Sequence, residues 1–95
     1  MILFQNQTTN DDSAVEEIID GSYRNAKATG VFDGAIITFQ ADHRDDDYAP
    51  MIEDSVAQTI TIPGVLNLQP FKSGMRLKAV LSNAGASTDI TLKTL

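Results

Sequence analysis

The chain has 95 residues, 42% of them hydrophobic, which is enough for one domain with a single small core. Thirteen acidic and seven basic side chains give a net charge of −6, which excludes the basic footprint that nucleic-acid binding requires. Cysteine is absent, and this excludes disulfides, thiolate catalysis and zinc sites built on cysteine. No segment approaches the roughly 20 consecutive apolar residues of a membrane-spanning helix. We therefore expect neither nucleic acid nor a membrane as a partner.

Short segments with strand character recur along the whole chain, separated by turns rich in Gly, Pro, Asn and Asp. Several of them alternate apolar and polar residues, the pattern of a strand with one buried face. The predicted strands are, in chain order, residues 2–8, 14–20, 22–29, 35–41, 48–53, 58–62, 65–69, 75–83 and 87–95. Residues 1–12 are expected to form an N-terminal strand or arm, with a polar turn over 9–13.

Residues 14–20 admit two interpretations. Ser13 and Glu16 have the spacing of a capping box, which would begin a helix. Gly21 would end that helix after one or two turns, and isolated helices so short are only marginally stable. The β-branched residues of the segment favour a strand, which is the interpretation that we adopt.

The clearest alternation runs through residues 35–41. The side chains predicted to face the core there are Ala35, Ile37, Phe39 and Ala41. Asp33-Gly34 precedes this strand and is a turn signal, since both residue types accept positive φ. The acidic segment 42–47 follows it and is predicted to be a hairpin connection. In the return strand, Pro50 indicates a sheet edge or a bulge.

Alternation also assigns core positions in the last third of the chain. The side chains predicted to face inward there are Ile60, Ile62, Leu66, Leu68, Leu77, Ala79, Leu81, Ile90 and Leu92. Arg76 and Lys78 then lie on the outer face of their strand. Residues 83–86 are predicted to be a hairpin loop between the last two strands.

Seven to nine short strands with turns at this spacing predict an all-β fold, an antiparallel β-sandwich of jelly-roll or immunoglobulin-like type. No helical pattern is long enough for a βαβ unit, so a parallel α/β sheet is not expected. We expect residues 1–95 to form a single β-sandwich domain.

The charges are unevenly distributed along the chain. Residues 1–55 hold twelve acidic and three basic side chains, whereas residues 56–95 hold one acidic and four basic ones, so the two parts carry about −9 and +3. Acidic and basic strands that pair within the sheets would explain this asymmetry. The alternative is that acidic and basic surfaces meet between neighbouring copies. We adopt the first interpretation, and the second stays open.

The acidic loop contains the only histidine, His43, beside a run of carboxylates. These carboxylates are Asp42, Asp45, Asp46 and Asp47. A general base needs an enclosed substrate pocket, which the tip of a hairpin loop does not provide. The carboxylates have the ligand type for calcium, but their spacing does not match an EF-hand loop, and calcium binding stays an open alternative. No serine lies in a Gly-x-Ser-x-Gly motif and no Gly-rich phosphate loop is present. We expect no enzymatic activity, no catalytic residue, no cofactor and no metal.

Two segments carry a resemblance to a known class of proteins. Gly30-Val-Phe-Asp-Gly-Ala35 has the form Gly-x-Phe-Asp-Gly-Ala and leads into the strand Ile36-Ile-Thr-Phe-Gln-Ala41. Gly74-Met-Arg-Leu77 has the form Gly-x-Arg-Leu and is followed by a Thr-rich final strand over 87–95. In this pattern the chain resembles small β-sandwich structural proteins of tailed bacteriophages, over roughly residues 14–95.

The resemblance implies a virion component that has no catalytic site and is assembled in the host cytoplasm. We expect a capsid decoration or cement protein that contacts the major capsid protein or other virion proteins and forms a homo-oligomer. A head–tail connector or tail component is one alternative, and a carbohydrate- or receptor-binding β-sandwich module is another. The interface candidates are the apolar N-terminal residues, an outward apolar residue and the basic strand, namely Ile2, Phe4, Ile36, Arg76 and Lys78.

Overall fold

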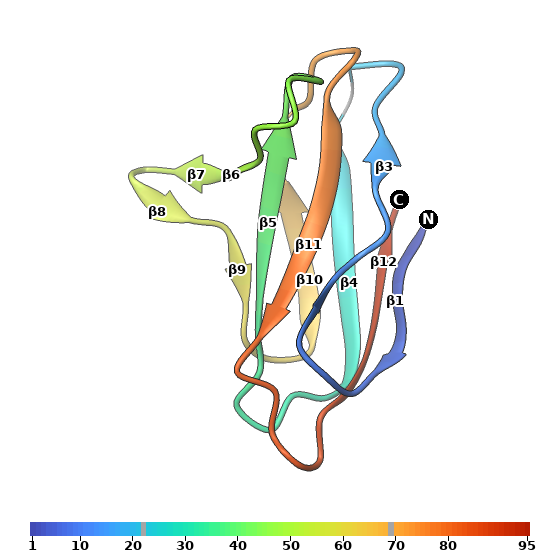
Figure 1. The fold of residues 1–95 in the computed structure, drawn as a ribbon, viewed down its shortest axis with the longest axis vertical. Coiled ribbons are helices and arrows are strands. Elements are labelled where there is room, and N and C mark those ends of the chain that lie inside the picture. Colours follow the sequence, from blue (N-terminus) through green and yellow to red (C-terminus); the bar gives the residue numbers. More distant parts are fainter. Residues whose placement is uncertain (22, 69) are drawn as a thin grey trace.

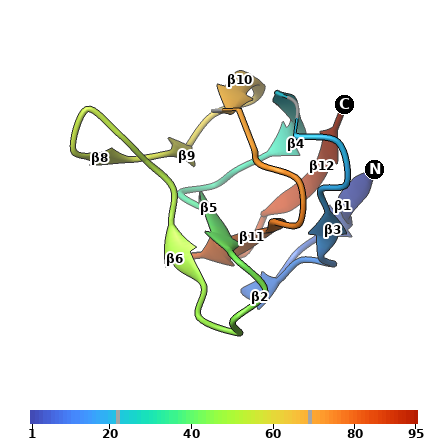
Figure 2. The ribbon, with the colours of Figure 1, turned by 90° about the horizontal axis from the view of Figure 1, so that it is seen from above.

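Alternating side chains build two antiparallel sheets in the computed structural model, and the sheets pack face to face (Figures 1 and 2). The structure describes residues 1–21, 23–68 and 70–95. These residues contain strands, turns and bends but no helix, so none of them forms a helix that could cross a membrane. The all-β prediction is confirmed.

Six strands have five or more residues, and six have only two, within the described part of the chain. The longer strands are β1 (Ile2–Gln7), β4 (Arg24–Val31), β5 (Ile36–Asp42), β10 (Gly64–Leu68), β11 (Arg76–Ser82) and β12 (Asp89–Thr94). The short ones are β2 (Asp11–Asp12), β3 (Glu16–Glu17), β6 (Ala49–Pro50), β7 (Ile52–Glu53), β8 (Val56–Ala57) and β9 (Thr59–Ile60).

One sheet has four strands in the order β1-β12-β4-β10. The larger sheet has the order β2-β11-β5-β6, with β3 also paired to β11 and β9 also paired to β5. The strands β7 and β8 form a small hairpin that projects from the body of the molecule (Figure 1). All pairs are antiparallel.

The chain changes sheet at nearly every connection, and among the described strands only β5 and β6 form a hairpin within one of the two main sheets. In an immunoglobulin fold the last two strands are neighbours in one sheet. Here β11 lies in the larger sheet and β12 in the four-stranded one. The strand order is therefore that of a jelly roll rather than the immunoglobulin-like alternative.

The core lies between the inner faces of β4 and β12 on one side and β5 and β11 on the other. Every second residue is buried along β11 and along β5 as far as Gln40, as the alternation predicts, whereas at the end of β5 Asp42 is buried in place of Ala41. The predicted inward residues with an exposed fraction of 1% or less are Ala35, Ile37, Phe39, Leu68, Leu77, Ala79, Leu81, Ile90 and Leu92. Ile60 is buried as well, and Ala41 and Leu66 are half-buried against this core.

The structure corrects three local predictions. Ile62 is 71% exposed, because β9 ends at Ile60 and the chain then crosses to the other sheet. Residues 83–86 are not a hairpin loop, because they connect the two sheets. The predicted turn over residues 9–13 contains the short strand β2, which pairs with β11. Residues 14–20 contain β3 and no helix, as we expected, while the predicted strand ends at Ser22 and Gln69 lie outside the described residues.

The turn between β4 and β5 depends on residues that accept positive φ. Asp33 and Gly34 have φ values of 49° and 83°, and the Ala35 N–H donates to the Phe32 carbonyl at 2.9 Å. Just before this turn, Gly30 has φ 107° and lies opposite β12. A Cβ atom at Gly30 would be 2.1 Å from the Asp89 carbonyl oxygen, which is closer than any real contact.

We predict that Gly30→Ala lowers the free energy of unfolding by more than about 1 kcal/mol, because its backbone conformation and its neighbour both exclude a side chain. The matched control is Gly64→Ala on β10, where an added Cβ meets no atom within 4 Å. This control should change the free energy by less than about 0.5 kcal/mol. Urea denaturation followed by circular dichroism measures both values, and equal effects at the two positions would contradict the fold at Gly30.

Candidate functional site

The five interface candidates do not form one surface. Ile2 and Phe4 lie on β1 in the four-stranded sheet, whereas Ile36, Arg76 and Lys78 lie in the larger sheet. Within the β5–β11 ladder, Ile36 pairs with Ser82 at one end and Arg76 pairs with Asp42 at the other. Ile36 is half-buried, and Ile2 is 49% exposed.

Phe4 is a core residue, which corrects its assignment to an interface. It is 3% exposed, and its neighbour Leu3 is 5% exposed. Two consecutive residues of one strand are buried because the register between β1 and β12 shifts between Ile2 and Phe4. Such an irregularity rotates the following side chain toward the other face, and simple alternation does not anticipate it.

Arg76 is held by two carboxylates of the acidic loop. Its Nε donates to Asp42 Oδ1 at 3.0 Å, its Nη2 also bonds Asp42, and the same Nη2 lies 2.9 Å from Asp46 Oδ1. The hydrogen bonds from Arg76 to both oxygens of Asp42 are bidentate, which is the strong form of an arginine–carboxylate pair. The Asp42 side chain is fully buried, while that of Asp46 is 90% exposed. The network ties the loop over 42–47 to the start of β11.

The Asp42 carboxyl has a pKa below its usual range. The hydrogen bond from the Arg76 side chain is the largest cause, and the backbone N–H groups of Arg44 and Asp46 lower the pKa further. Burial acts in the opposite direction but does not outweigh them. The hydrogen bonds to the carboxylates of Asp42 and then Asp46 raise the pKa of Arg76, so Asp42 and Arg76 are both charged at neutral pH.

Lys78 is also engaged within the molecule. Its Nζ lies 2.9 Å from Asp12 Oδ2 on β2 and 4.3 Å from the centre of the Tyr48 ring. The guanidinium of Arg76 lies 5.7 Å from the same ring, so both cations flank Tyr48. The Tyr48 hydroxyl is buried and has no hydrogen-bond partner among the described residues.

Glu16 connects the two sheets at one side of the sandwich. It belongs to β3, which pairs with β11, yet its carboxylate lies 2.8 Å from Arg24 Nε on β4 and accepts a hydrogen bond from the Thr94 hydroxyl on β12. Thr94 is fully buried. One carboxylate therefore bonds both central strands of the four-stranded sheet.

These contacts explain much of the charge asymmetry along the sequence. Arg76 and Lys78, from the basic part of the chain, pair with Asp42, Asp46 and Asp12 from the acidic part. Pairing within the molecule, our first interpretation, is confirmed for these two cations. Their side chains are only 21% and 18% exposed, so they do not form an open basic patch.

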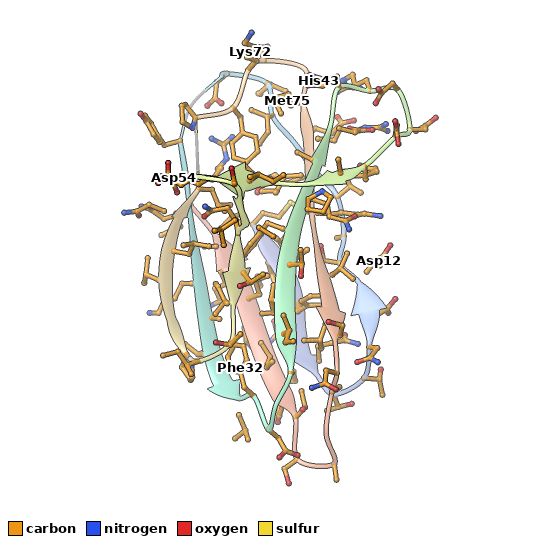
Figure 3. The ribbon with its side chains drawn as sticks, turned by 90° about the vertical axis from the view of Figure 1, so that its left-hand side faces the viewer. Asp12, Phe32, His43, Asp54, Lys72 and Met75 are labelled. Carbon is orange, nitrogen blue, oxygen red and sulfur yellow. The ribbon has the colours of Figure 1, made fainter. Side chains whose placement is uncertain are left out.

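The carboxylates of the acidic loop lie in two different environments, an ion pair with Arg76 and an open groove. Asp42 and Asp46 bond Arg76, whereas Asp45, Asp47 and His43 line an open groove of about 390 Å³. His43 and Met75 lie at the same end of the molecule (Figure 3), and Met75 lines the groove too. Within the described residues, no group of three or more His, Asp or Glu side chains is placed to hold a metal ion. The loop therefore does not gather its four aspartates around one point.

Several exposed apolar side chains were not assigned to the surface by the sequence analysis. Ile19, Ile62, Val65 and Val56 are 79%, 71%, 66% and 65% exposed. For Val65 a signal existed, since it alternates with Leu66 and so must face outward.

Comparison with known proteins found no matching family model, no matching curated protein and no matching solved structure.

We predict that Asp42 makes the stability of the protein sensitive to acid. Because its pKa in the folded state is below the unfolded value of about 3.9, its contribution is fully present above that pH and is lost as the pH falls through the folded pKa. The free energy of unfolding should therefore fall more steeply between about pH 5 and pH 2 in the original protein than in Asp42→Asn. Urea denaturation across this pH range gives both curves, and parallel curves would refute the role of Asp42.

Proposed function

We propose that this chain is a structural protein of a tailed bacteriophage virion, and specifically a capsid decoration or cement protein. The observation that carries the proposal is how the two resembling segments lie in the fold. Residues 36–41 form most of β5, and residues 76–81 form most of β11. These strands pair residue by residue, from Ile36 with Ser82 to Asp42 with Arg76, in the middle of the larger sheet. Two of the resembling segments are therefore paired strands of one sheet, and the Thr-rich final strand forms β12 of the other sheet.

A cement protein acts by burying its surface against neighbouring subunits, and stable interfaces bury at least about 1,000 Å². The outside of this domain offers apolar side chains for such contacts on several elements. The most exposed on β1 and around β7 to β10 are Ile2, Ile52, Val56, Ile62 and Val65. Ile2 and the outer face around Ile36 are the proposed contacts with the major capsid protein. The exposed parts of the Arg76 and Lys78 side chains would add to these contacts while their ion pairs stay intact.

The carbohydrate-binding alternative would depend on an exposed aromatic platform. Among the described residues, Tyr23 is the only aromatic side chain that is mostly exposed, at 69%. The four phenylalanines are buried in the core. We therefore keep decoration as the proposed function, with a connector or tail position as its close rival.

The test is to mix the purified protein with heads of the parent phage that were prepared without it. We predict saturable binding over the whole shell and a higher temperature of DNA release. Ile2→Ser should weaken binding about ten-fold if β1 is a contact, whereas Ile19→Ser, at a residue outside the proposed contacts, should not. Binding at one vertex would indicate a connector or tail component. No binding to heads, together with absence of the protein from purified virions, would refute a structural role.

A further inference from the structure

The strand β10 is an open edge of the four-stranded sheet. It pairs with β4 on one side and, among the residues that the structure describes, it is the last strand of the sheet on the other. An edge strand presents backbone N–H and C=O groups that another chain can bond. Other edges of the two main sheets, in the described part of the molecule, carry features that hinder such pairing: β1 has register shifts, β2 and β3 are acidic, β6 contains Pro50, and β9 has only two residues. β10 has a regular register over five residues and none of these features.

The hydrogen bonds of β4 show which groups of β10 are free. On β4, Asn25 exchanges both backbone hydrogen bonds with Leu95, at 3.1 and 2.9 Å, so its polar groups point away from β10. In antiparallel pairs, hydrogen-bonded and non-hydrogen-bonded positions alternate. Asn67 and Val65, which lie opposite Asn25 and Lys27, therefore direct their N–H and C=O groups to the open side. Leu66 between them bonds β4.

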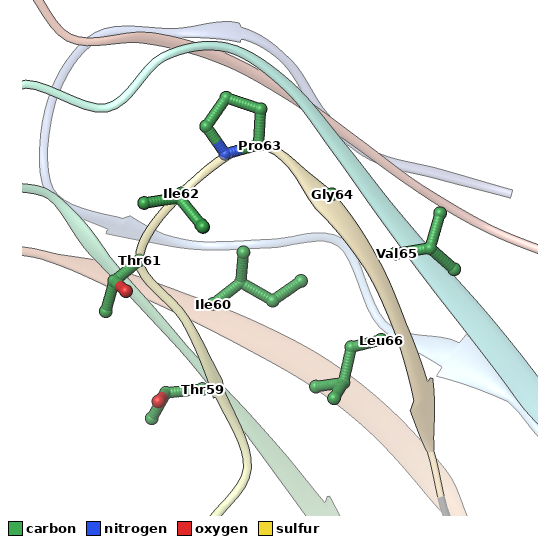
Figure 4. A pocket seen from close by; sticks show the side chains of 8 residues that line it. All are labelled: Thr59, Ile60, Thr61, Ile62, Pro63, Gly64, Val65 and Leu66. Carbon is green, nitrogen blue, oxygen red and sulfur yellow. The ribbon is translucent and has the colours of Figure 1, made fainter.

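The edge strand itself is uncharged, and Glu53 of β7 is the charged side chain that shares a hollow with Asn67 and Leu68 at its end. None of the five residues of β10 is charged. Val65 is 66% exposed, and Ile62, just before the strand, is 71% exposed. A groove of about 260 Å³ lies between β9 and β10, where Ile60 and Leu66 project between the strands and Val65 points away from them (Figure 4).

We propose that β10 pairs with β10 of a second copy of this chain, around a two-fold axis at Leu66. In this antiparallel register, Val65 of one copy lies opposite Asn67 of the other, and both residues have free backbone groups on that side. Each Val65–Asn67 pair exchanges two hydrogen bonds, so the symmetric junction has about four. The two four-stranded sheets then form one continuous sheet.

Charge opposes a second copy less at β10 than at the acidic strands. A two-fold interface puts a surface against itself, so charged surfaces repel their copies. With a net charge of −6, and with Asp or Glu on β2, β3 and β7, most of the molecule disfavours self-contact. The uncharged β10 does not. An interface at the lower limit of stability needs about a tenth of the 5309 Å² surface from each copy, and the exposed Ile62 and Pro63 beside β10 add to the area that the strand itself would bury.

The test is sedimentation of the full chain over a range of concentrations up to about 1 mM. The original protein should show a monomer–dimer equilibrium. Asn67→Pro removes a free N–H without removing a bond to β4 and should raise the dimer dissociation constant at least ten-fold. The matched control Asn67→Thr keeps the N–H and should leave the constant within about three-fold.

Amide hydrogen exchange of the original protein provides a second readout that does not depend on any variant folding. The amides of Val65 and Asn67 should become protected as the concentration rises, while the exposed amides of the acidic loop should not. A protein that stays monomeric to about 1 mM, or a dimer in which these two amides exchange freely, would overturn the proposal. Since the isolated protein is measured, this result is independent of binding to phage heads.

Discussion

The packing of the β5–β11 pair against the β4–β12 pair is the interaction on which the rest of the structure depends. Ile37, Phe39, Leu77 and Leu92 are completely buried between them, and each such side chain contributes about 1.5–3 kcal/mol by leaving water. A small domain has few residues with which to make a core, so both sheets must direct their apolar faces inward. The chain achieves this by changing sheet at almost every turn, which brings the distant strands β1 and β12 side by side.

Polar contacts then fix the sides of this sandwich. Arg76 fastens the acidic loop to β11 through Asp42 and Asp46, and Glu16 bonds residues of β4 and β12 from the opposite sheet. These groups use most of their bonding capacity within the molecule. Exposed apolar side chains and the free backbone of β10 remain available to partners among the described residues, and both suit the surface-acting role that we propose.

Local pattern predicted the strands but not their partners. Leu77, Ala79 and Leu81 were assigned to the core because alternation is a property of the strand itself. The burial of Phe4 depends on a register shift against β12, and the exposure of Ile62 depends on where the chain leaves one sheet for the other. The pairing of Arg76 with Asp42 joins residues 34 positions apart. Such contacts are set by topology, and the loop at 83–86 looked like a hairpin because nothing in its own sequence reveals the change of sheet.

The central claim is that β11 and β12, although consecutive, lie in opposite sheets. Inter-strand Hα–Hα nuclear Overhauser effects test it directly. The polar groups of Phe39 bond Gln58 and Met51 on the other side, so Phe39 and Ala79 form a non-hydrogen-bonded pair with their Cα atoms about 4.5 Å apart. We expect strong effects between Phe39 and Ala79 and between Ala28 and Leu92. Strong effects between β11 and β12 instead, as in a hairpin, would contradict the fold and what we infer from it.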